Sequence, residues 1–261
     1  MSVQLQALAD EVFDALAAQA RVSAESIRRP FGEVIRNPAY PDLPAVNMIQ
    51  GLVAPDWTLD EVLAAIRREL GTARRVQVTS RDPHTVGALD PRLRAWGASD
   101  SRYGMALVRP PEPQPRPGPG PAPDVVGIES AAQWAACASF LRRHAVRHNW
   151  TAAWMRQLFA LIRWRAANTP HRYYVACRGD EVTGCLGLFQ HGSTAYVHHP
   201  FGWASMSSDV EDVLTLTVIE EATALGCDRV VTECAREDGR SMWRLGFRVV
   251  GEQQVWTSPP V

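Results

Sequence analysis

The stretch that decides the fold begins with the alternating segment Thr194-Ala-Tyr-Val-His-His199. After a loop, a helix-like segment runs from Asp209 to Leu225 and ends at Gly226. The chain then continues with Asp228-Arg-Val-Val-Thr-Glu-Cys234, Met242-Trp-Arg-Leu-Gly-Phe247 and an alternating run from Arg248 to Trp256. These patterns predict a strand, a loop, a helix, a strand, a short helix that ends in Gly-Phe, and a final strand.

The residues before this stretch extend the pattern back to Asp124. The sequence predicts a strand, two helices opened by Ser130 and Thr151, and a hairpin turning at Arg178-Gly-Asp-Glu181. The expected elements are strand 124–128, helices 131–144 and 151–167, and strands 172–178 and 182–189. This order, over residues 124–261, resembles the GNAT-type N-acyltransferases.

The first half of the chain contains a similar order of elements. A capping box at Thr58-Leu-Asp-Glu61 opens a helix that ends at Leu70, and Arg75–Thr79 alternates like a strand. Residues Asp90–Trp96 predict a short helix that Gly97 ends. The repeat favours a tandem protein with a degenerate first lobe, although a chance likeness between two αβ patterns explains the same order.

The predicted fold class is therefore α+β, with two GNAT-like lobes, each a mixed twisted β-sheet flanked by helices. The expected domains are an N-terminal lobe at residues 1–109, a proline-rich linker at 110–123 and a C-terminal lobe at 124–261. The first lobe should open with a helix over Val3–Ala20. Residues Ser23–Pro44, which contain four prolines, should be irregular, and Asp82-Pro83 should form a turn.

Composition excludes several classes of function. The net charge of −1 gives no reason to expect a nucleic-acid or membrane partner, and no stretch is apolar enough to span a bilayer. A cytoplasmic protein is expected. The 27 basic residues are all arginine, which excludes mechanisms that need a lysine amine. None of the five cysteines forms a Cys-x-x-Cys pair, so no metal site is expected.

The resemblance implies an acetyl-CoA or other acyl-CoA donor, with the acyl thioester along the strand that contains Tyr196 and Val197. Backbone amides near Gly202, Ser207 and Ser208 would then hold the diphosphate. The family's glycine-rich loop is absent, and Asp209, Glu211 and Asp212 stand where a diphosphate would lie. As an alternative, a serine caps the helix and the acidic residues stabilise its N-terminus.

The resemblance also places the acyl group where the two central strands separate. Glu233, His198 and His199 are the candidate proton acceptors at that point. Since neighbouring residues of a strand face opposite ways, only one of the two histidines would enter the site. The position of the family's acidic tyrosine is occupied by Met242. A structural role is the alternative for each of these residues.

The acceptor site of the family lies near the end of the first helix of this lobe. Arg143, Arg147 and Trp150 are the candidate substrate-binding residues there. A solvated helix end explains the two arginines equally well.

Three functions remain open at this point. The first is acetyl-CoA-dependent transfer to a small-molecule amine. The second is a GNAT-like protein that does not use CoA and catalyses another step of small-molecule biosynthesis. The third is a non-catalytic binding module. Neither the acceptor nor the oligomeric state follows from the sequence, and a homodimer is compatible with it.

Overall fold

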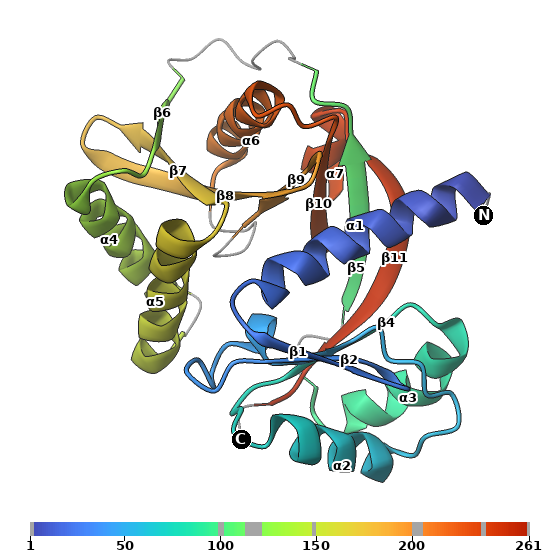
Figure 1. Cartoon of the computed structure of the whole chain (residues 1–261). Helices are drawn as coiled ribbons and strands as arrows, with labels where there is room; N and C mark the ends of the chain where they lie inside the picture. Colours follow the sequence, from blue (N-terminus) through green and yellow to red (C-terminus); the bar gives the residue numbers. More distant parts are fainter. Residues whose placement is uncertain are drawn as a thin grey trace. The chain divides into compact units, whose positions relative to one another are not determined.

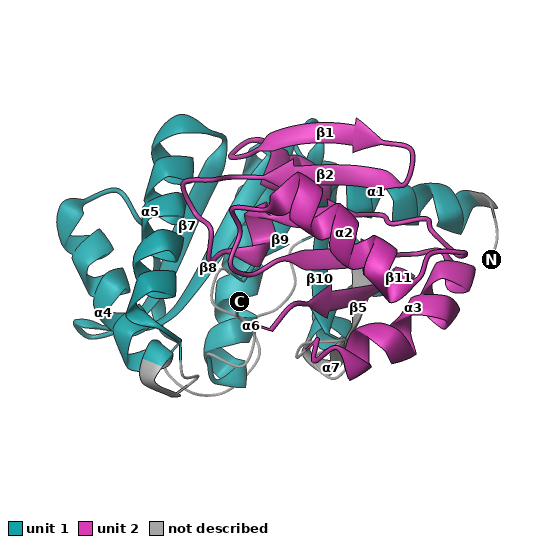
Figure 2. Cartoon of the chain, turned by 90° about the horizontal axis from the view of Figure 1, so that it is seen from below, with its two compact units in different colours: residues 1–16, 106–250 teal, residues 17–105, 251–261 magenta. Residues whose placement is uncertain are grey.

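A computed structural model describes residues 3–98, 102–112, 122–147, 150–199, 206–235 and 239–259. The chain forms two compact units, which Figure 2 colours separately. Unit 1 contains Met1–Leu16 and Ala106–Val250, and unit 2 contains Ala17–Met105 and Gly251–Val261. The chain passes from one unit to the other within α1 (Val3–Arg21), β5 (Arg102–Arg109) and β11 (Arg248–Thr257).

Unit 1 is a mixed sheet with helices beside it (Figure 1). Its strands follow the order β5-β10-β9-β8-β7-β6, in which β9 and β10 are parallel and the hairpin β7–β8 is antiparallel. The remaining elements of the unit are β6 (Asp124–Gly127), α4 (Ala131–Arg147), α5 (Ala152–Asn168), β7 (His171–Arg178), β8 (Glu181–His191), β9 (Thr194–His198), α6 (Ser208–Ala224), β10 (Arg229–Ala235) and α7 (Gly239–Arg244).

Two neighbouring residues of β8 show which helices cover each face of this sheet. A Cβ atom added to Gly184 would lie 2.7 Å from side-chain atoms of Leu214 and Val210, so this face packs against α6. The next residue, Cys185, points the other way, and its sulfur lies 3.9 Å from that of Cys137 in α4. Odd-numbered residues of β8 in this stretch therefore face α4 and even-numbered ones face α6.

Unit 2 is a smaller mixed sheet with the order β1-β2-β3-β4-β11. Strands β3 and β4 are parallel, and residues 254–257 of β11 pair antiparallel with β4. The buried core between the sheet and α2 includes Val62, Leu70 and Trp256. The elements that lie within this unit are β1 (Glu25–Arg29), β2 (Gly32–Arg36), the short helix η1 (Pro44–Val46), β3 (Met48–Gln50), α2 (Leu59–Leu70), β4 (Gln77–Ser80) and α3 (Pro83–Ala95).

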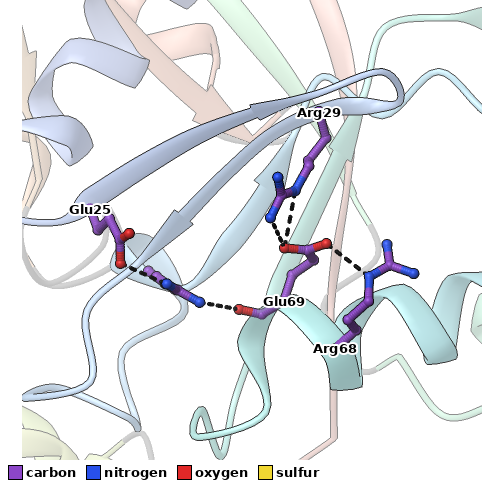
Figure 3. A network of polar contacts seen from close by, with 5 residues as sticks. Glu25, Arg29, Arg68 and Glu69 are labelled. Atoms are coloured by element: carbon purple, nitrogen blue, oxygen red, sulfur yellow. Dashed lines mark hydrogen bonds and ion pairs between the residues drawn. The ribbon is translucent and has the colours of Figure 1, made fainter.

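A buried carboxylate links α2 to the first hairpin of unit 2 (Figure 3). Glu69 is 6% exposed and accepts hydrogen bonds from Arg29 at 2.8 Å and from Arg68 at 2.9 Å. The hydrogen bond from Arg29 is the largest cause that lowers the pKa of Glu69, and burial opposes it. Arg36, which pairs with the exposed Glu25, also donates to the backbone carbonyl of Glu69.

The predicted fold class, α+β with mixed sheets and flanking helices, is confirmed. The helix over 59–70 begins with the expected capping box, in which Thr58 and Glu61 bond each other's backbone amides. Gly226 ends α6 with a φ of 75°, a left-handed conformation that glycine adopts without steric cost.

Two expectations for the first half are wrong. Residues 23–44 are not irregular, because β1 and β2 form an antiparallel hairpin there, with Pro30 outside both strands. Asp82-Pro83 is a helix start rather than a turn. Asp82 caps α3 and Pro83 is its first residue, where the missing amide hydrogen costs nothing.

The compact units also differ from the expected domain bounds at residues 109 and 124. The last strand pairs with β4, so residues 251–261 belong with the first half of the chain. Within unit 1, Glu11 of α1 accepts hydrogen bonds from Thr194 at 2.8 Å and from Arg229. These contacts explain why residues 1–16 belong with the second half.

Candidate active site

The parallel strands β9 and β10 pair for only part of their length. Their backbone register runs through Arg229↔Thr194 and Val230↔Ala195 and ends at Val231↔Tyr196. At the next position the Thr232 hydroxyl donates a hydrogen bond to the Val197 carbonyl at 2.8 Å. At the point where the two strands separate, the Thr232 hydroxyl thus donates the hydrogen bond that a backbone amide would donate in a continuing strand pair.

Three side chains beside this point share one face of the sheet. Tyr196 and Val231 are register partners, so Glu233, two residues further along β10, faces the same side as Tyr196 and His198. Glu233 is half-buried and close enough to Tyr196 to raise the pKa of its phenol, although burial raises it more. The structure therefore brings the predicted residues His198 and Glu233 to one face.

The His198 ring lies directly over Gly187, its register partner in β8. A Cβ atom at Gly187 would be 2.2 Å from His198 Nε2, so only glycine leaves room for the imidazole. The ring is also surrounded by aromatic neighbours, with centroids 5.6 Å away at His171, 5.7 Å at Tyr173 and 5.7 Å at Tyr196. His198 thus extends from β9 across β8 to β7, on the face that α4 and α5 cover.

Hydrogen bonds at the end of α5 fix the tautomer of His171. The Thr169 hydroxyl donates to the Arg165 carbonyl at 2.7 Å, and the same oxygen lies 2.6 Å from His171 Nδ1. Because the hydroxyl has a single hydrogen, Nδ1 must be the donor in the second contact. Burial, together with His198 and Arg165, lowers the pKa of His171 far enough to keep the ring neutral. Its Nε2 is therefore a bare acceptor.

Two nitrogen atoms of this cluster are buried without a hydrogen bond. Among the described residues, neither His171 Nε2 nor His198 Nε2 has a partner. Both residues are nearly inaccessible, at 3% and 7% exposure. An unsatisfied buried polar atom costs about 1–3 kcal/mol, so two of them on neighbouring rings call for a ligand, a water molecule or a chemical role.

A buried guanidinium controls the charge of the cluster. Arg165 of α5 is 5% exposed, and its positive charge acts on His171, His198, Tyr173 and Tyr196. Burial first, and Arg165 second, lower the pKa of His198 to about 3. Burial raises the pKa of the Tyr173 phenol, and Arg165 partly offsets that rise. Both imidazoles are consequently neutral at physiological pH.

His199 follows the end of β9 and is only partly exposed. Burial and the neighbouring His198 hold its pKa well below the ordinary histidine value. Val197, which precedes the two histidines in the chain, is fully buried, and its carbonyl accepts the hydrogen bond from Thr232 of β10.

The start of α6 carries the predicted carboxylates. Ser207 caps the helix by position, but its side chain makes no capping bond to the backbone, and Ser208 is exposed. A hydrogen bond from Ser207 is the largest cause that lowers the pKa of Asp209, which also pairs with Arg178. Burial raises the pKa of Asp212 against the effect of Arg244, which lies 3.3 Å away. Gly202 lies outside the described residues.

Of the predicted substrate-binding residues, Arg143 has its described contacts at the β7–β8 turn. Arg143 is 51% exposed, donates to the Val182 carbonyl at 3.0 Å and pairs with Glu181, so it holds the β7–β8 turn. The Trp150 ring contacts that of Trp154, with centroids 4.5 Å apart. Arg147 is the last residue of α4, and its side chain lies outside the described part of the chain.

Sequence reasoning missed Arg165, His171, Tyr173 and Gly187. They come from an ordinary-looking helix and hairpin, and no motif connects them to the strand at 194–198. The one signal was alternation: His171 and Tyr173 share a face of a strand that pairs with β8, as His198 and Tyr196 do on its other side.

Other structures share this architecture. A functionally unknown conserved protein of Staphylococcus epidermidis superposes with a TM-score of 0.68 at 10% identity, over 91% of this chain and 95% of that one. A GCN5-related N-acetyltransferase from Kribbella flavida superposes with a TM-score of 0.53 at 11% identity, over 99% and 96%. One from Sphaerobacter thermophilus gives 0.50 at 12% identity, over 91% and 77%. No family model and no curated protein matches the sequence.

These likenesses confirm the fold that the sequence indicated. The chain has the fold of the GCN5-related N-acetyltransferases, the GNAT proteins. At identities of 12% or less they establish no substrate. In the described part of the chain, no helix has the length and apolar character needed to cross a membrane. The described histidine, cysteine and acidic side chains form no group of three or more that would hold a metal ion.

Proposed function

We propose that the protein is an acyltransferase that moves an acyl group from a thioester, acetyl-CoA or another acyl-CoA, to the amine of a small molecule. The observation that carries this proposal is the separation of β9 and β10 after Val231↔Tyr196, next to Glu233 and His198. The GNAT resemblance implies that the acyl thioester lies at this separation. The fold alone does not fix the chemistry, so the proposal rests on this local geometry.

In the proposed reaction the neutral amine attacks the thioester carbonyl carbon. A carbon–nitrogen bond forms, the carbon–sulfur bond breaks and the thiolate leaves with the electron pair. Backbone amides of residues 194–199 would polarise the carbonyl oxygen. Glu233 would accept the proton that the nitrogen loses, since it faces the same side as Tyr196 and is half-buried.

The histidines are assigned smaller parts in this reaction. A pKa of about 3 makes His198 a weak base, so we assign it a hydrogen bond to the acceptor rather than proton transfer. Burial and His198 hold the pKa of His199 well below the ordinary histidine value, so His199 is a weak base as well. Tyr196 and Val197 would line the acyl end of the donor.

The far end of the donor is less well matched by the described residues. The first turn of α6 carries Asp209, Glu211 and Asp212, of which Asp209 pairs with Arg178 and Asp212 with Arg244. Another negatively charged group is disfavoured there. We therefore expect the CoA diphosphate to contribute little to binding.

The first experiment is calorimetric titration of the protein with acetyl-CoA and with acetyl-pantetheine, which lacks the diphosphate. The proposal expects both to bind with similar affinity, and amine screening with either donor to reveal turnover. Glu233→Gln should then lower turnover at least about 100-fold, because general base catalysis contributes this much. Glu129→Gln, an exposed glutamate of the same unit, is the matched control.

Failure of every thioester to bind would refute the proposal. Unchanged turnover in Glu233→Gln would refute only the assignment of the base.

The acidic first turn of α6 also favours a second function. A GNAT-like protein that does not use CoA, and catalyses another step of small-molecule biosynthesis, has no need for a diphosphate site. Mass spectrometry of ligands that copurify with the protein would test this alternative. A non-catalytic binding module would give a bound ligand without any turnover.

A further inference from the structure

The cluster of His171, Tyr173 and His198 is buried in unit 1 and contains polar atoms without a hydrogen-bond partner. The three ring centroids form a triangle with sides of 5.6, 5.7 and 6.1 Å. Within the described residues, the Nε2 atoms of both histidines lack a partner although each residue is more than nine-tenths buried. Apolar side chains would fill this space at a lower cost.

The hydrogen-bonding role of His171 Nε2 is set by Thr169. Thr169 commits its hydroxyl hydrogen to the Arg165 carbonyl, so His171 donates from Nδ1 and presents the lone pair of Nε2. The group that satisfies His171 must therefore be a hydrogen-bond donor. An anion such as a carboxylate has no hydrogen to offer.

Burial and the charge of Arg165 disfavour a cationic donor at the two histidines of this site. Arg165 lies within electrostatic reach of all three rings and is itself buried. An ammonium group placed there would be repelled by the guanidinium and would lose its hydration. An uncharged N–H or O–H group meets neither penalty.

We propose that His171, Tyr173 and His198 form a ligand site that accepts an uncharged N–H or O–H donor, bound to Nε2 of His171, and rejects cations. The proposal rests on the proposed function in one respect: it takes the ligand to be the acyl acceptor in its neutral, nucleophilic amine form. His171 is then a residue that touches the substrate.

The test uses two small probes on the full chain labelled with ¹⁵N at histidine. Hydroxylamine is uncharged at neutral pH and donates N–H and O–H bonds, whereas methylammonium is a cation of similar size. Long-range ¹H–¹⁵N spectra of the imidazoles are expected to show His171 protonated at Nδ1. Titration with hydroxylamine should shift its Nε2 signal, and methylammonium should bind at least about ten-fold more weakly.

Variants of Thr169 provide the matched pair. Thr169→Val keeps the shape of the side chain and removes the hydroxyl that fixes the tautomer, so hydroxylamine affinity should fall about ten-fold. Thr169→Ser keeps the hydroxyl and should retain the affinity. These variants leave the His171 ring in place, which separates loss of the site from loss of the fold.

Several outcomes would overturn the proposal. They are a His171 protonated at Nε2, the absence of any shift with hydroxylamine, or equal shifts with both probes. Because no acyl donor is present, the result is independent of the proposed acyl transfer. A positive titration in a protein that binds no thioester would keep the site and remove the acyltransferase function.

Discussion

Two parts of the molecule have the same local topology but differ in the hydrogen bonds that follow the last residue pair of their parallel strands. In unit 2, β3, α2, β4 and α3 follow one another, and in unit 1 β9, α6, β10 and α7 do so. In each group the two strands are parallel and pair over a few residues. The last pair is Ile49↔Val78 in unit 2 and Val231↔Tyr196 in unit 1.

Beyond these last pairs, the chain of unit 2 stays joined. Gly51 donates to the Thr79 hydroxyl at 3.1 Å, Leu52 donates to the Thr79 carbonyl at 2.7 Å, and the Ser80 hydroxyl donates to the Leu52 carbonyl at 2.6 Å. The Leu52 side chain is fully buried in the core. In unit 1 the corresponding position is linked by the hydroxyl of Thr232, which donates to the Val197 carbonyl.

The difference shows how one topology serves two purposes. Where hydrogen bonds and an apolar side chain fill the space between the strands, the pair is a structural element. At the same place in unit 1 stand the half-buried Glu233 on β10 and His198 on β9, whose ring extends over β8. We therefore expect substitutions in unit 2 to change stability alone, and those at the separation in unit 1 to change activity as well.

The largest effect should come from Gly187→Ala in unit 1. The new methyl group would meet the His198 ring at 2.2 Å, and the ring is enclosed by other aromatic side chains. We expect a loss of about 3 kcal/mol in the free energy of unfolding, because overpacked cores must distort. Urea denaturation followed by near-UV circular dichroism measures this loss.

Gly87→Ala is the control for this change. Position 87 lies in α3 of unit 2 with no atom within 4 Å of the added Cβ, so alanine should raise stability by up to about 1 kcal/mol. A Gly187→Ala variant as stable as the wild type would show that His198 does not occupy the described position.

A smaller effect is expected from Glu69→Gln in unit 2. Loss of the carboxylate removes the charge from three hydrogen bonds, two donated by Arg29 and one by Arg68. Both arginines regain some hydration, and we expect a loss of about 2 kcal/mol at neutral pH. The folded-state pKa of Glu69 is lowered. Its contribution is therefore complete above the unfolded pKa of about 4.3 and disappears as the pH falls through the folded value.

Stability curves of wild type and Glu69→Gln between neutral pH and the acid range test this prediction. The two curves should converge as the pH falls below that of an ordinary glutamate. Glu25→Gln, at an exposed pair with Arg36, should leave stability unchanged. A constant difference between wild type and Glu69→Gln down to the acid limit would contradict the ionic origin of the effect.

The comparison is tested most directly by Ser80→Ala and Thr232→Val. Both residues are fully buried, and each change leaves one carbonyl without its hydroxyl donor, at a cost of about 1.5 kcal/mol. Ser80→Ala should not affect thioester binding or turnover. Thr232→Val should change the affinity for the thioester, since Val197 lines the proposed donor site. Equal effects of both changes on activity would remove the distinction between the two strand pairs.

The smallest effect separates the two helices that follow these strands. Thr58→Ala breaks the capping box of α2 and should cost about 1 kcal/mol. Ser207→Ala should cost less than about 0.5 kcal/mol, because the Ser207 side chain makes no capping bond to α6. Thermal unfolding curves of the two variants provide the comparison, and a larger loss in Ser207→Ala would contradict the described caps.

Much of this fold follows from local sequence. The alternating runs and the cap at Thr58 gave the strands of unit 1 and the bounds of α2, because period and capping are properties of neighbouring residues. The start of α3 was missed because Asp82-Pro83 opens a helix as readily as it forms a turn. The exchange of residues 1–16 and 251–261 between halves depends on distant pairing, which no local pattern encodes.

The candidate site was less accessible to sequence reasoning. His198 and Glu233 were found because they end two central strands. Arg165 and His171 were missed because their role depends on the register of β7 against β8. It also depends on Gly187 of β8, which leaves room for the His198 ring and belongs to no recognisable motif. The acceptor character of His171 depends further on a single hydroxyl hydrogen, which only the geometry of Thr169 assigns.

The passage of β5 and β11 between the units has a consequence for dividing the gene. Cutting within the proline-rich segment would leave a first fragment that ends with β5 residues belonging to unit 1 and that lacks the β11 residues paired with β4. The second fragment would carry residues 251–261, which include the end of β11 and belong to unit 2, and would lack the β5 residues that belong to unit 1. We therefore expect that neither half folds alone and that the halves would have to be produced together to complement each other.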